Sequence, residues 1–154
     1  MTINSCKREI LYRKAHGRSL SARNKEKINL LLGLQADEAL FLSLPETNNI
    51  ISELKKKRQI FCELIEFSSV TECFKFTSSQ IEGRKYYLLM DEDWKYCGAY
   101  KIENDFSFSA EFDFDKSKSD EIRLISIDFS AQISIDYSES CGEKSFEVRI
   151  RKYG

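Results

Sequence analysis

Proline and glycine are scarce in this chain, which has one proline and six glycines among 154 residues. Such low numbers exclude long flexible linkers and low-complexity tracts. The longest apolar stretches cover residues 28–34 and 39–44, far short of the roughly 20 residues that cross a bilayer. The first residues become polar at once and lack the apolar segment of a secretory signal. We therefore expect a cytoplasmic protein without a membrane partner.

Side chains that commonly perform catalysis are also few. His16, the only histidine, lies in a basic segment without a nearby carboxylate to orient it, which favours a surface residue over a general base. None of the glycines belongs to a phosphate-binding loop motif. The five cysteines form no C-x-x-C pair, which argues against a zinc site or a disulfide framework. We expect no enzymatic activity, no catalytic residue, no cofactor and no metal.

Charge is present in quantity but unevenly distributed along the chain. Residues 1–60 contain 12 Lys and Arg against 6 Asp and Glu, and residues 61–154 contain 12 against 19. The local net charges of +6 and −7 add up to the formal −1 of the whole chain. Asymmetry of this kind bears on partners more than on fold. It is more typical of a protein that binds a charged partner than of an enzyme.

The N-terminal part has the apolar spacing of helices. Residues 5–34 carry apolar side chains three and four positions apart, which predicts helical structure. We expect a break near Gly17, a helix cap at Ser19 or Ser21, and a helix end near Gly33.

A second helix is predicted to begin at Pro45 and to run to about Ser68, where β-branched and aromatic residues begin. Its basic run, residues 55–58, is either the solvated face of the helix or an anion-binding patch. We expect this helix to cover the apolar face of the sheet that follows.

Beyond residue 69 the apolar period changes from 3.6 to 2, which indicates strands with one wet face. Alternation is cleanest over residues 106–115, 125–137 and 146–151, and further strands are predicted over 73–78, 85–90 and 97–102. The sequence thus predicts one α+β domain over residues 1–154. Residues 1–68 would be mainly helical, and residues 69–154 would form an antiparallel sheet of five or six strands.

Acidic residues beside an aromatic side chain form the leading candidate for partner binding. One acidic cluster occupies a predicted turn directly before Trp94, the only tryptophan, and another lies on the polar face of the strand predicted over 106–115. A negative surface attracts a basic partner, although a solvated strand face tolerates the same pattern. The predicted partner-binding residues are Asp91, Glu92, Asp93, Trp94, Tyr96, Glu111, Asp113 and Asp115.

Two other functions remain open. The basic N-terminal part could contact the phosphates of a nucleic acid, although a pI of about 6.0 and the acidic sheet argue against it. The acidic turn at 91–93 could instead hold a divalent metal for hydrolysis, although it lacks a regular calcium-loop motif. The cations proposed for nucleic-acid binding are Arg13, Lys14, Arg18, Arg23, Lys25 and Lys27.

Two segments resemble blocks of YxiF-type proteins. The first is Ala-Asp-Glu-Ala-Leu-Phe-Leu-Ser-Leu-Pro-Glu-Thr at 36–47, followed by Ile50 and Ile51. The second joins Tyr-Leu-Leu-Met-Asp at 87–91 to Trp-Lys-Tyr-Cys-Gly-Ala-Tyr at 94–100. Those bacterial proteins resemble the immunity proteins of contact-dependent growth inhibition and related polymorphic toxins. The resemblance implies stoichiometric inhibition of a cognate toxin domain, most often a nuclease, and assigns no interface residue.

Overall fold

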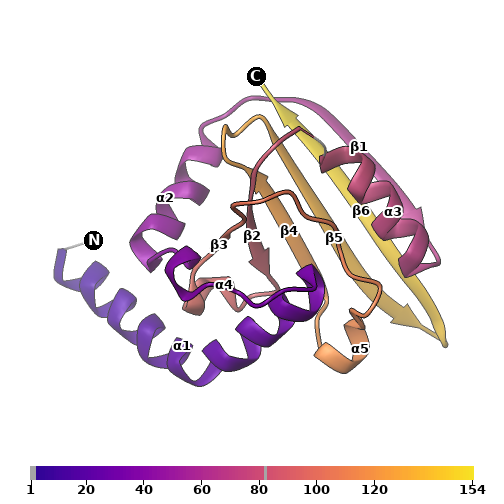
Figure 1. Ribbon diagram of the computed structural model, residues 1–154. Helices are drawn as coiled ribbons and strands as arrows, with labels where there is room; N and C mark the ends of the chain where they lie inside the picture. The colour runs from indigo at the N-terminus through magenta and orange to yellow at the C-terminus, as the bar shows by residue number, and fades with distance from the viewer. Residues whose placement is uncertain (1–2, 82) are drawn as a thin grey trace.

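The computed structural model describes residues 3–81 and 83–154, with side chains from residue 7 onward. Helices combine with an antiparallel six-stranded sheet of order β1-β6-β5-β4-β2-β3 (Figure 1), which confirms the α+β class. Among the described residues, no helix has both the length and the apolar character needed to span a bilayer. The elements are α1 (Ile3–Leu32), the 3-10 turn η1 (Glu38–Leu40), α2 (Leu44–Lys55), β1 (Gln59–Phe67), α3 (Val70–Ile81), β2 (Tyr86–Met90), α4 (Trp94–Cys97), β3 (Tyr100–Lys101), α5 (Phe114–Ser117), β4 (Glu121–Ser126), β5 (Ala131–Ser140) and β6 (Glu143–Tyr153).

The main core lies on one side of the sheet, which we call the core face. The C-terminal half of α1 covers it with Ile28 and Leu31, which are 1% and 0% exposed and share one side of the helix. Helix α3 adds Phe74, which packs against Phe108 and Phe114 with ring centroids 5.1 and 6.1 Å apart. The segment between β3 and β4 therefore contributes to the core without being a strand.

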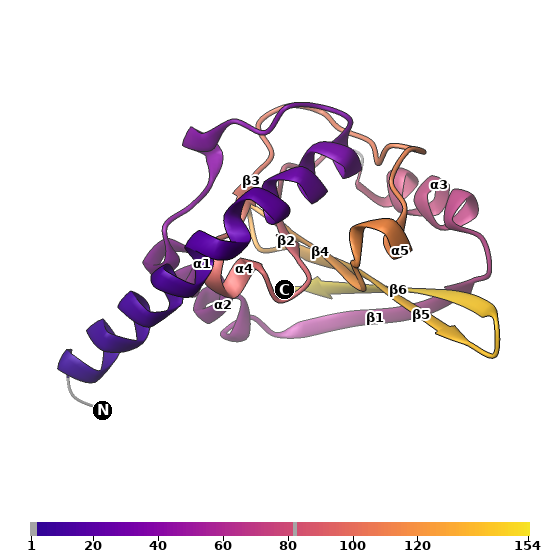
Figure 2. The same cartoon turned by 90° about the horizontal axis from the view of Figure 1, so that it is seen from below.

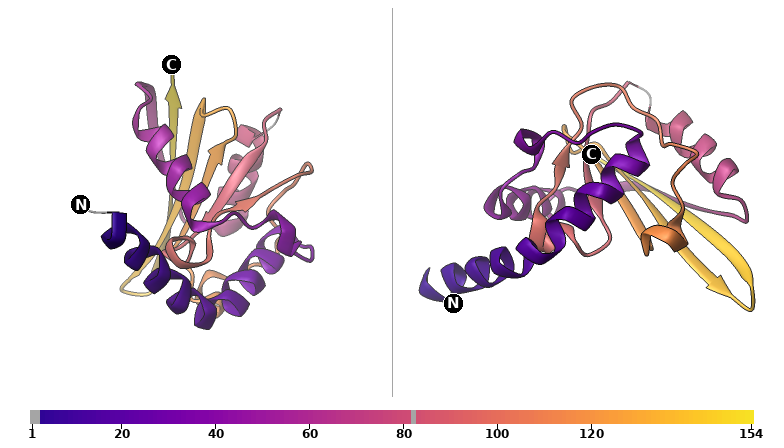
Figure 3. Two further views of the ribbon diagram at one scale, coloured as in Figure 1. Left: turned by 90° about the vertical axis from the view of Figure 1, so that its left-hand side faces the viewer. Right: turned by 60° about the horizontal axis from the view of Figure 1, so that its bottom comes forward.

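Helix α2 lies on the opposite side of the sheet, which we call the open face (Figure 3, left). Ile50 and Leu54 of α2 pack against Leu89 of β2 and Ile125 of β4 in a second, smaller cluster. The expectation that the helix from Pro45 covers the main apolar face is wrong, because α1 and α3 cover that face. Since α2 packs near β2 and β4, the polar side chains of β5 and β6 line a groove on the open face.

Helix α1 is continuous, so the predicted break near Gly17 is wrong (Figure 2). The glycine serves close packing instead, since a Cβ atom there would lie 2.2 Å from the carbonyl oxygen of Tyr96. Ser19 and Ser21 lie inside the helix and donate hydrogen bonds to carbonyls three residues earlier, so neither is a cap. The predicted helix end is confirmed at Gly33, whose φ of +64° suits glycine.

Two segments adopt the opposite type of structure from the one predicted. Residues 59–67 form strand β1 where a helix was expected to continue, and residues 70–81 form helix α3 where a strand was expected over 73–78. Short apolar runs fit both periods. Residues 59–67 form a strand because they pair antiparallel with β6, and residues 70–81 form a helix because its apolar side packs against the core face.

The remaining strand predictions are correct in part. Strands β2 and β6 match the patterns at 85–90 and 146–151. The pattern at 125–137 contains a chain reversal at residues 127–130, which separates β4 from β5. Of the strand predicted over 97–102, the structure has only the two residues of β3. Residues 106–115 form no strand, because their alternate phenylalanines enter the core from an irregular segment that leads into α5.

Candidate functional site

Three arginines lie on the open face of the sheet, on β4 and β6. Arg123 of β4 lies opposite Ser134 of β5, and Ser134 lies opposite Arg149 of β6. Arg151, two positions further along β6, lies opposite Gln132. Alternate residues of a strand share one side of the sheet. We call Arg123, Arg149 and Arg151 the arginine row.

A row of carboxylates runs beside the arginine row. Glu121, Asp136, Glu147 and Glu66 occupy successive cross-strand positions on β4, β5, β6 and β1. Like charges in directly opposed positions repel each other. Burial, followed by the nearby charges of Glu121 and Glu147, raises the pKa of Asp136 above its usual value. We call these four residues the acidic row, and their repulsion favours contact with a cationic group.

The arginine row lines a groove of about 500 Å³ between the sheet and the C-terminal end of α2. Lys55 and Lys57 form part of the α2 side. Gln132 and Ser134 of β5 line the sheet side of the groove and are 6% and 8% exposed. Five cationic and two anionic side chains line the groove, so its formal net charge is +3. The basic run that the sequence left open as an anion patch thus contributes two residues to a basic groove.

Arg149 and Arg151 take part in no ion pair among the described residues. Within the part of the chain that the structure describes, neither guanidinium has a carboxylate oxygen within 4.0 Å. Arg123 differs, because it forms a 2.9 Å ion pair with Glu121 and lies over the ring of Trp94, 5.7 Å from its centroid. Arg149 and Arg151 are therefore the members of the arginine row whose charge is not already paired with a carboxylate of the described chain.

The structure places Asp91 and Asp93 inside the protein, with side chains 9% and 8% exposed. Their carboxylates lie 2.6 and 3.0 Å from the ammonium group of Lys27. Asp91 also accepts hydrogen bonds from Ser119 and from two backbone N–H groups. Burial opposes its charged form, but the hydrogen bonds from Lys27 and from the two backbone N–H groups outweigh burial and hold the pKa of Asp91 below its usual value. The expectation that both residues supply a surface field is therefore wrong.

At the proposed metal site of residues 91–93, the ammonium group of Lys27 lies between the two carboxylates and donates a hydrogen bond to each of them. Among the described residues, no group of three or more His, Cys, Asp or Glu side chains is arranged to hold a metal ion. The turn is therefore an ion-pair centre that joins α1 to the end of β2.

Three predicted residues near this turn remain at least partly accessible. Glu92 is exposed and lies 3.6 Å from Lys95. Trp94 is half-buried against α2, and Tyr96 packs edge-on against His16 with ring centroids 4.5 Å apart. Trp94 and Tyr96 line a pocket beside the N-terminal half of α1. Trp94 contacts Arg123 of the arginine row, but the two residues line different pockets.

Glu111, Asp113 and Asp115 lie together around a second pocket, of about 530 Å³. They do not share a strand face as expected, since they span an irregular segment and the short helix α5. Asp113 caps α5 by accepting two backbone N–H bonds. Asp115 lies 2.9 Å from Lys144 and accepts the hydroxyl of Tyr137, and its pKa lies below its usual value for these reasons. These local partners reduce the field that Asp113 and Asp115 present to a partner.

Four of the six cations proposed for nucleic-acid binding pair with other groups of the protein, and Lys27 among them is buried. Arg23 and Lys25 form ion pairs with Asp93 and Glu38. Lys27 is buried, and Arg13 donates to Asn48 and to a backbone carbonyl of α4. Of the six, two keep side chains without such a partner among the described residues. These are Lys14 and Arg18.

Replacing Asp136 with Asn tests the repulsion within the acidic row. We expect a gain in unfolding free energy of about 0.5 kcal/mol at neutral pH, because solvent screens a partly exposed charge. The gain should disappear when acid protonates the carboxyl group, whose pKa is raised in the folded state. Urea titrations at both pH values measure it. Glu143→Gln at the exposed β5–β6 turn is the control, and an equal gain there would contradict the repulsion.

The arginine row carries little signal in the sequence. The alternation at 146–151 places Arg149 and Arg151 on the polar face of a strand. Their neighbours, however, follow from the pairing of β6 with β5 and β1. The alternation at 125–137 continues through the chain reversal at 127–130. The sequence therefore does not show that Arg123 lies in the same row as Arg149.

Comparison with other proteins identifies no relative from which a function could be inferred. No protein-family model, curated protein or solved structure matches this chain, so the geometry of the open face carries the functional argument.

Proposed function

We propose that this chain is a non-catalytic binding protein that docks an acidic surface of a protein partner on its open face. The observation that carries the proposal is the pair Arg149 and Arg151, two positions apart beside a groove of net positive charge and without carboxylate partners among the described residues. In the form that the YxiF resemblance implies, the partner is a toxin domain and docking neutralises it. The partner surface would then be acidic rather than the basic one expected for the acidic residues.

The chemistry of the two arginines suits a protein carboxylate. A guanidinium group presents planar donors that match a carboxylate in a two-point contact. The β6 strand holds both side chains on a sheet paired on both of its sides, by β1 and β5. Such a support lowers the entropy lost when a partner binds.

The acidic row favours a protein partner over a nucleic acid. A nucleic-acid backbone carries continuous negative charge, and Asp136 and Glu147 next to the arginine row would repel it. A protein surface can place carboxylates against the arginine row and cations against the acidic row. Matching both rows fixes the orientation of the partner and excludes surfaces with a different pattern.

Co-expression with a candidate toxin domain tests the function. We expect the wild-type chain to restore growth and to co-purify with the toxin at a 1:1 molar ratio. Arg149→Glu/Arg151→Glu should lose both properties, because two like-charge contacts replace two ion pairs. Lys14→Glu/Arg18→Glu changes the charge equally on α1 and should keep both.

Each arm of this experiment can contradict a separate part of the proposal. Failure of the wild-type chain to restore growth would overturn toxin neutralisation. Full rescue by Arg149→Glu/Arg151→Glu would keep neutralisation but overturn the open face as the docking surface. Loss of rescue by Lys14→Glu/Arg18→Glu alone would move the interface to α1.

A further inference from the structure

Strand β1 forms one edge of the sheet (Figure 2). It is nine residues long and pairs only with β6 among the described strands. The outer backbone N–H and C=O groups of an edge strand lack a ladder partner and can pair with another chain. This edge is therefore a surface on which a further strand can be added.

The side chains of β1 do little to protect this edge. Ile60, Phe61 and Leu64 are 64%, 43% and 52% exposed, and they are three of the large apolar side chains that remain exposed in the described chain. Natural edge strands are commonly short or covered by charged residues. A long edge with three exposed apolar side chains indicates an interaction site.

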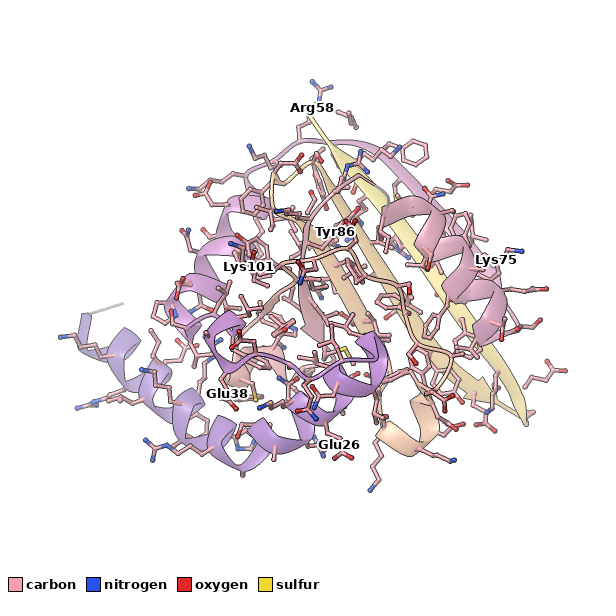
Figure 4. All side chains as sticks on the ribbon, in the orientation of Figure 1. Glu26, Glu38, Arg58, Lys75, Tyr86 and Lys101 are labelled. Atoms are coloured by element: carbon pink, nitrogen blue, oxygen red, sulfur yellow. The ribbon has the colours of Figure 1, made fainter. Side chains whose placement is uncertain are left out.

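The charges along β1 are arranged so that the strand complements itself. The basic run at 55–58 comes directly before the strand, Glu63 lies at the strand's centre and Glu66 lies near its end. Within the described residues, Arg58 and Glu66 have no ion-pair partner, and Arg58 extends away from the sheet (Figure 4). An antiparallel copy of the same strand would bring basic and acidic halves together.

We propose that two copies of this chain pair antiparallel along β1, about a twofold axis at Cys62, and so join their sheets. A twofold axis makes the interface self-complementary, so each residue pair occurs twice. This register sets Arg58 opposite Glu66 of the second copy, and Ile60 opposite Leu64 of the second copy. Its central pair consists of the two exposed Cys62 residues.

Registers with the axis displaced from Cys62 toward the end of β1 fit the side chains less well. An axis at Glu63 would place two carboxylates directly opposite each other, which is destabilising. An axis at Leu64 would set Arg58 opposite Val70, which already belongs to α3. The pairing of β1 with β6 is irregular between Gln59 and Phe61, so a thiol probe at Cys62 provides a test of register that does not depend on that segment.

Sedimentation velocity of the full chain over a concentration series tests the dimer. We expect the mass to double with concentration. Arg58→Glu and Glu66→Arg should each raise the dissociation constant at least about tenfold, because two ion pairs become two repulsive pairs. The double variant Arg58→Glu/Glu66→Arg should restore dimerisation, which a merely misfolded chain would not do.

Lys75→Glu, on the exposed side of α3 (Figure 4), is the control and should leave the dissociation constant unchanged. A monomer at every concentration would overturn the proposal. A dimer that ignores the charge exchange between Arg58 and Glu66 would also overturn it.

Oxidation with diamide tests the register. The two Cys62 thiols would each give up a proton and together two electrons to diamide, which becomes the hydrazine as the disulfide forms. We expect a covalent dimer from the wild-type chain and from Cys141→Ser, and none from Cys62→Ser. Cys141 is also exposed, at the β5–β6 turn. A cross-link that persists in Cys62→Ser would contradict the proposed axis.

Discussion

Replacing Lys27 with Met should lower the free energy of unfolding by about 3–5 kcal/mol, the cost of leaving buried charge without its partner. The ammonium group lies between Asp91 and Asp93, and all three side chains are less than a tenth exposed. Arg23 remains near Asp93 at 3.5 Å, but its own side chain is half exposed. The variant would therefore hold two buried carboxylates with one peripheral cation.

The matched control is Lys25→Met, two residues earlier on the same helix. Lys25 also forms an ion pair at 2.9 Å, but its partner Glu38 has a side chain that is 81% exposed. Exposed pairs contribute about 0–1 kcal/mol. Urea unfolding of both variants at neutral pH measures the difference, and equal losses would contradict the buried ion-pair centre.

Acid should reduce the contribution of this centre. The pKa of Asp91 is lowered in the folded protein, so its charged form stabilises the fold above the pKa of the unfolded chain. That stabilisation is lost as the pH falls through the folded value. The destabilisation caused by Lys27→Met should therefore shrink at low pH, since the Asp91 carboxylate then becomes neutral.

Replacing Gly98 with Ala should destabilise the fold by about 3 kcal/mol, because backbone strain and a steric clash add together. Gly98 has a φ of +87°, which side-chain-bearing residues rarely adopt. A Cβ atom there would lie 2.1 Å from the carbonyl oxygen of Leu42. Relief of the clash would separate two segments that are joined by hydrogen bonds from Leu42 to Ala99 and from Ala99 to Thr47.

Gly142→Ala separates the two causes. Gly142 also has a positive φ, of +81°, but a Cβ atom added there would meet no described atom within 4 Å. Only the backbone strain of a positive φ remains at this position, so we expect Gly142→Ala to lower the free energy of unfolding by about 1 kcal/mol. Thermal or urea unfolding compares the two variants, and equal losses would show that the contact between Gly98 and Leu42 is not close.

The elements that the sequence predicted correctly are those whose local pattern has one interpretation. The helix predicted from Pro45 is correct at its beginning, where Ser43 and Glu46 form a capping box, and β6 alternates without interruption. Gly33 ends α1 in the left-handed conformation that the pattern suggested. These features depend on nearest neighbours in the chain, so the sequence shows them directly.

The errors arise where tertiary contacts override the local pattern. The phenylalanines at 106–114 alternate like a strand, yet Phe108 and Phe112 pack around Phe74 from an irregular segment. The acidic residues before Trp94 were predicted to lie on the surface for the same reason. Asp91 and Asp93 instead pair with buried Lys27 of α1, which lies 64 and 66 residues away in the chain. No local pattern predicts such a pairing. The arginine row depends on strand register for the same reason.

The measurement that tests the central claim most directly is the affinity of the partner for three charge-reversed chains. Calorimetric titration would compare Arg149→Glu/Arg151→Glu on the open face, Asp113→Lys/Asp115→Lys at the second pocket and Lys14→Glu/Arg18→Glu on α1. We predict that only the first variant loses affinity, by at least about a hundredfold for two reversed contacts. Unchanged affinity of that variant, with loss in either of the others, would contradict docking on the open face.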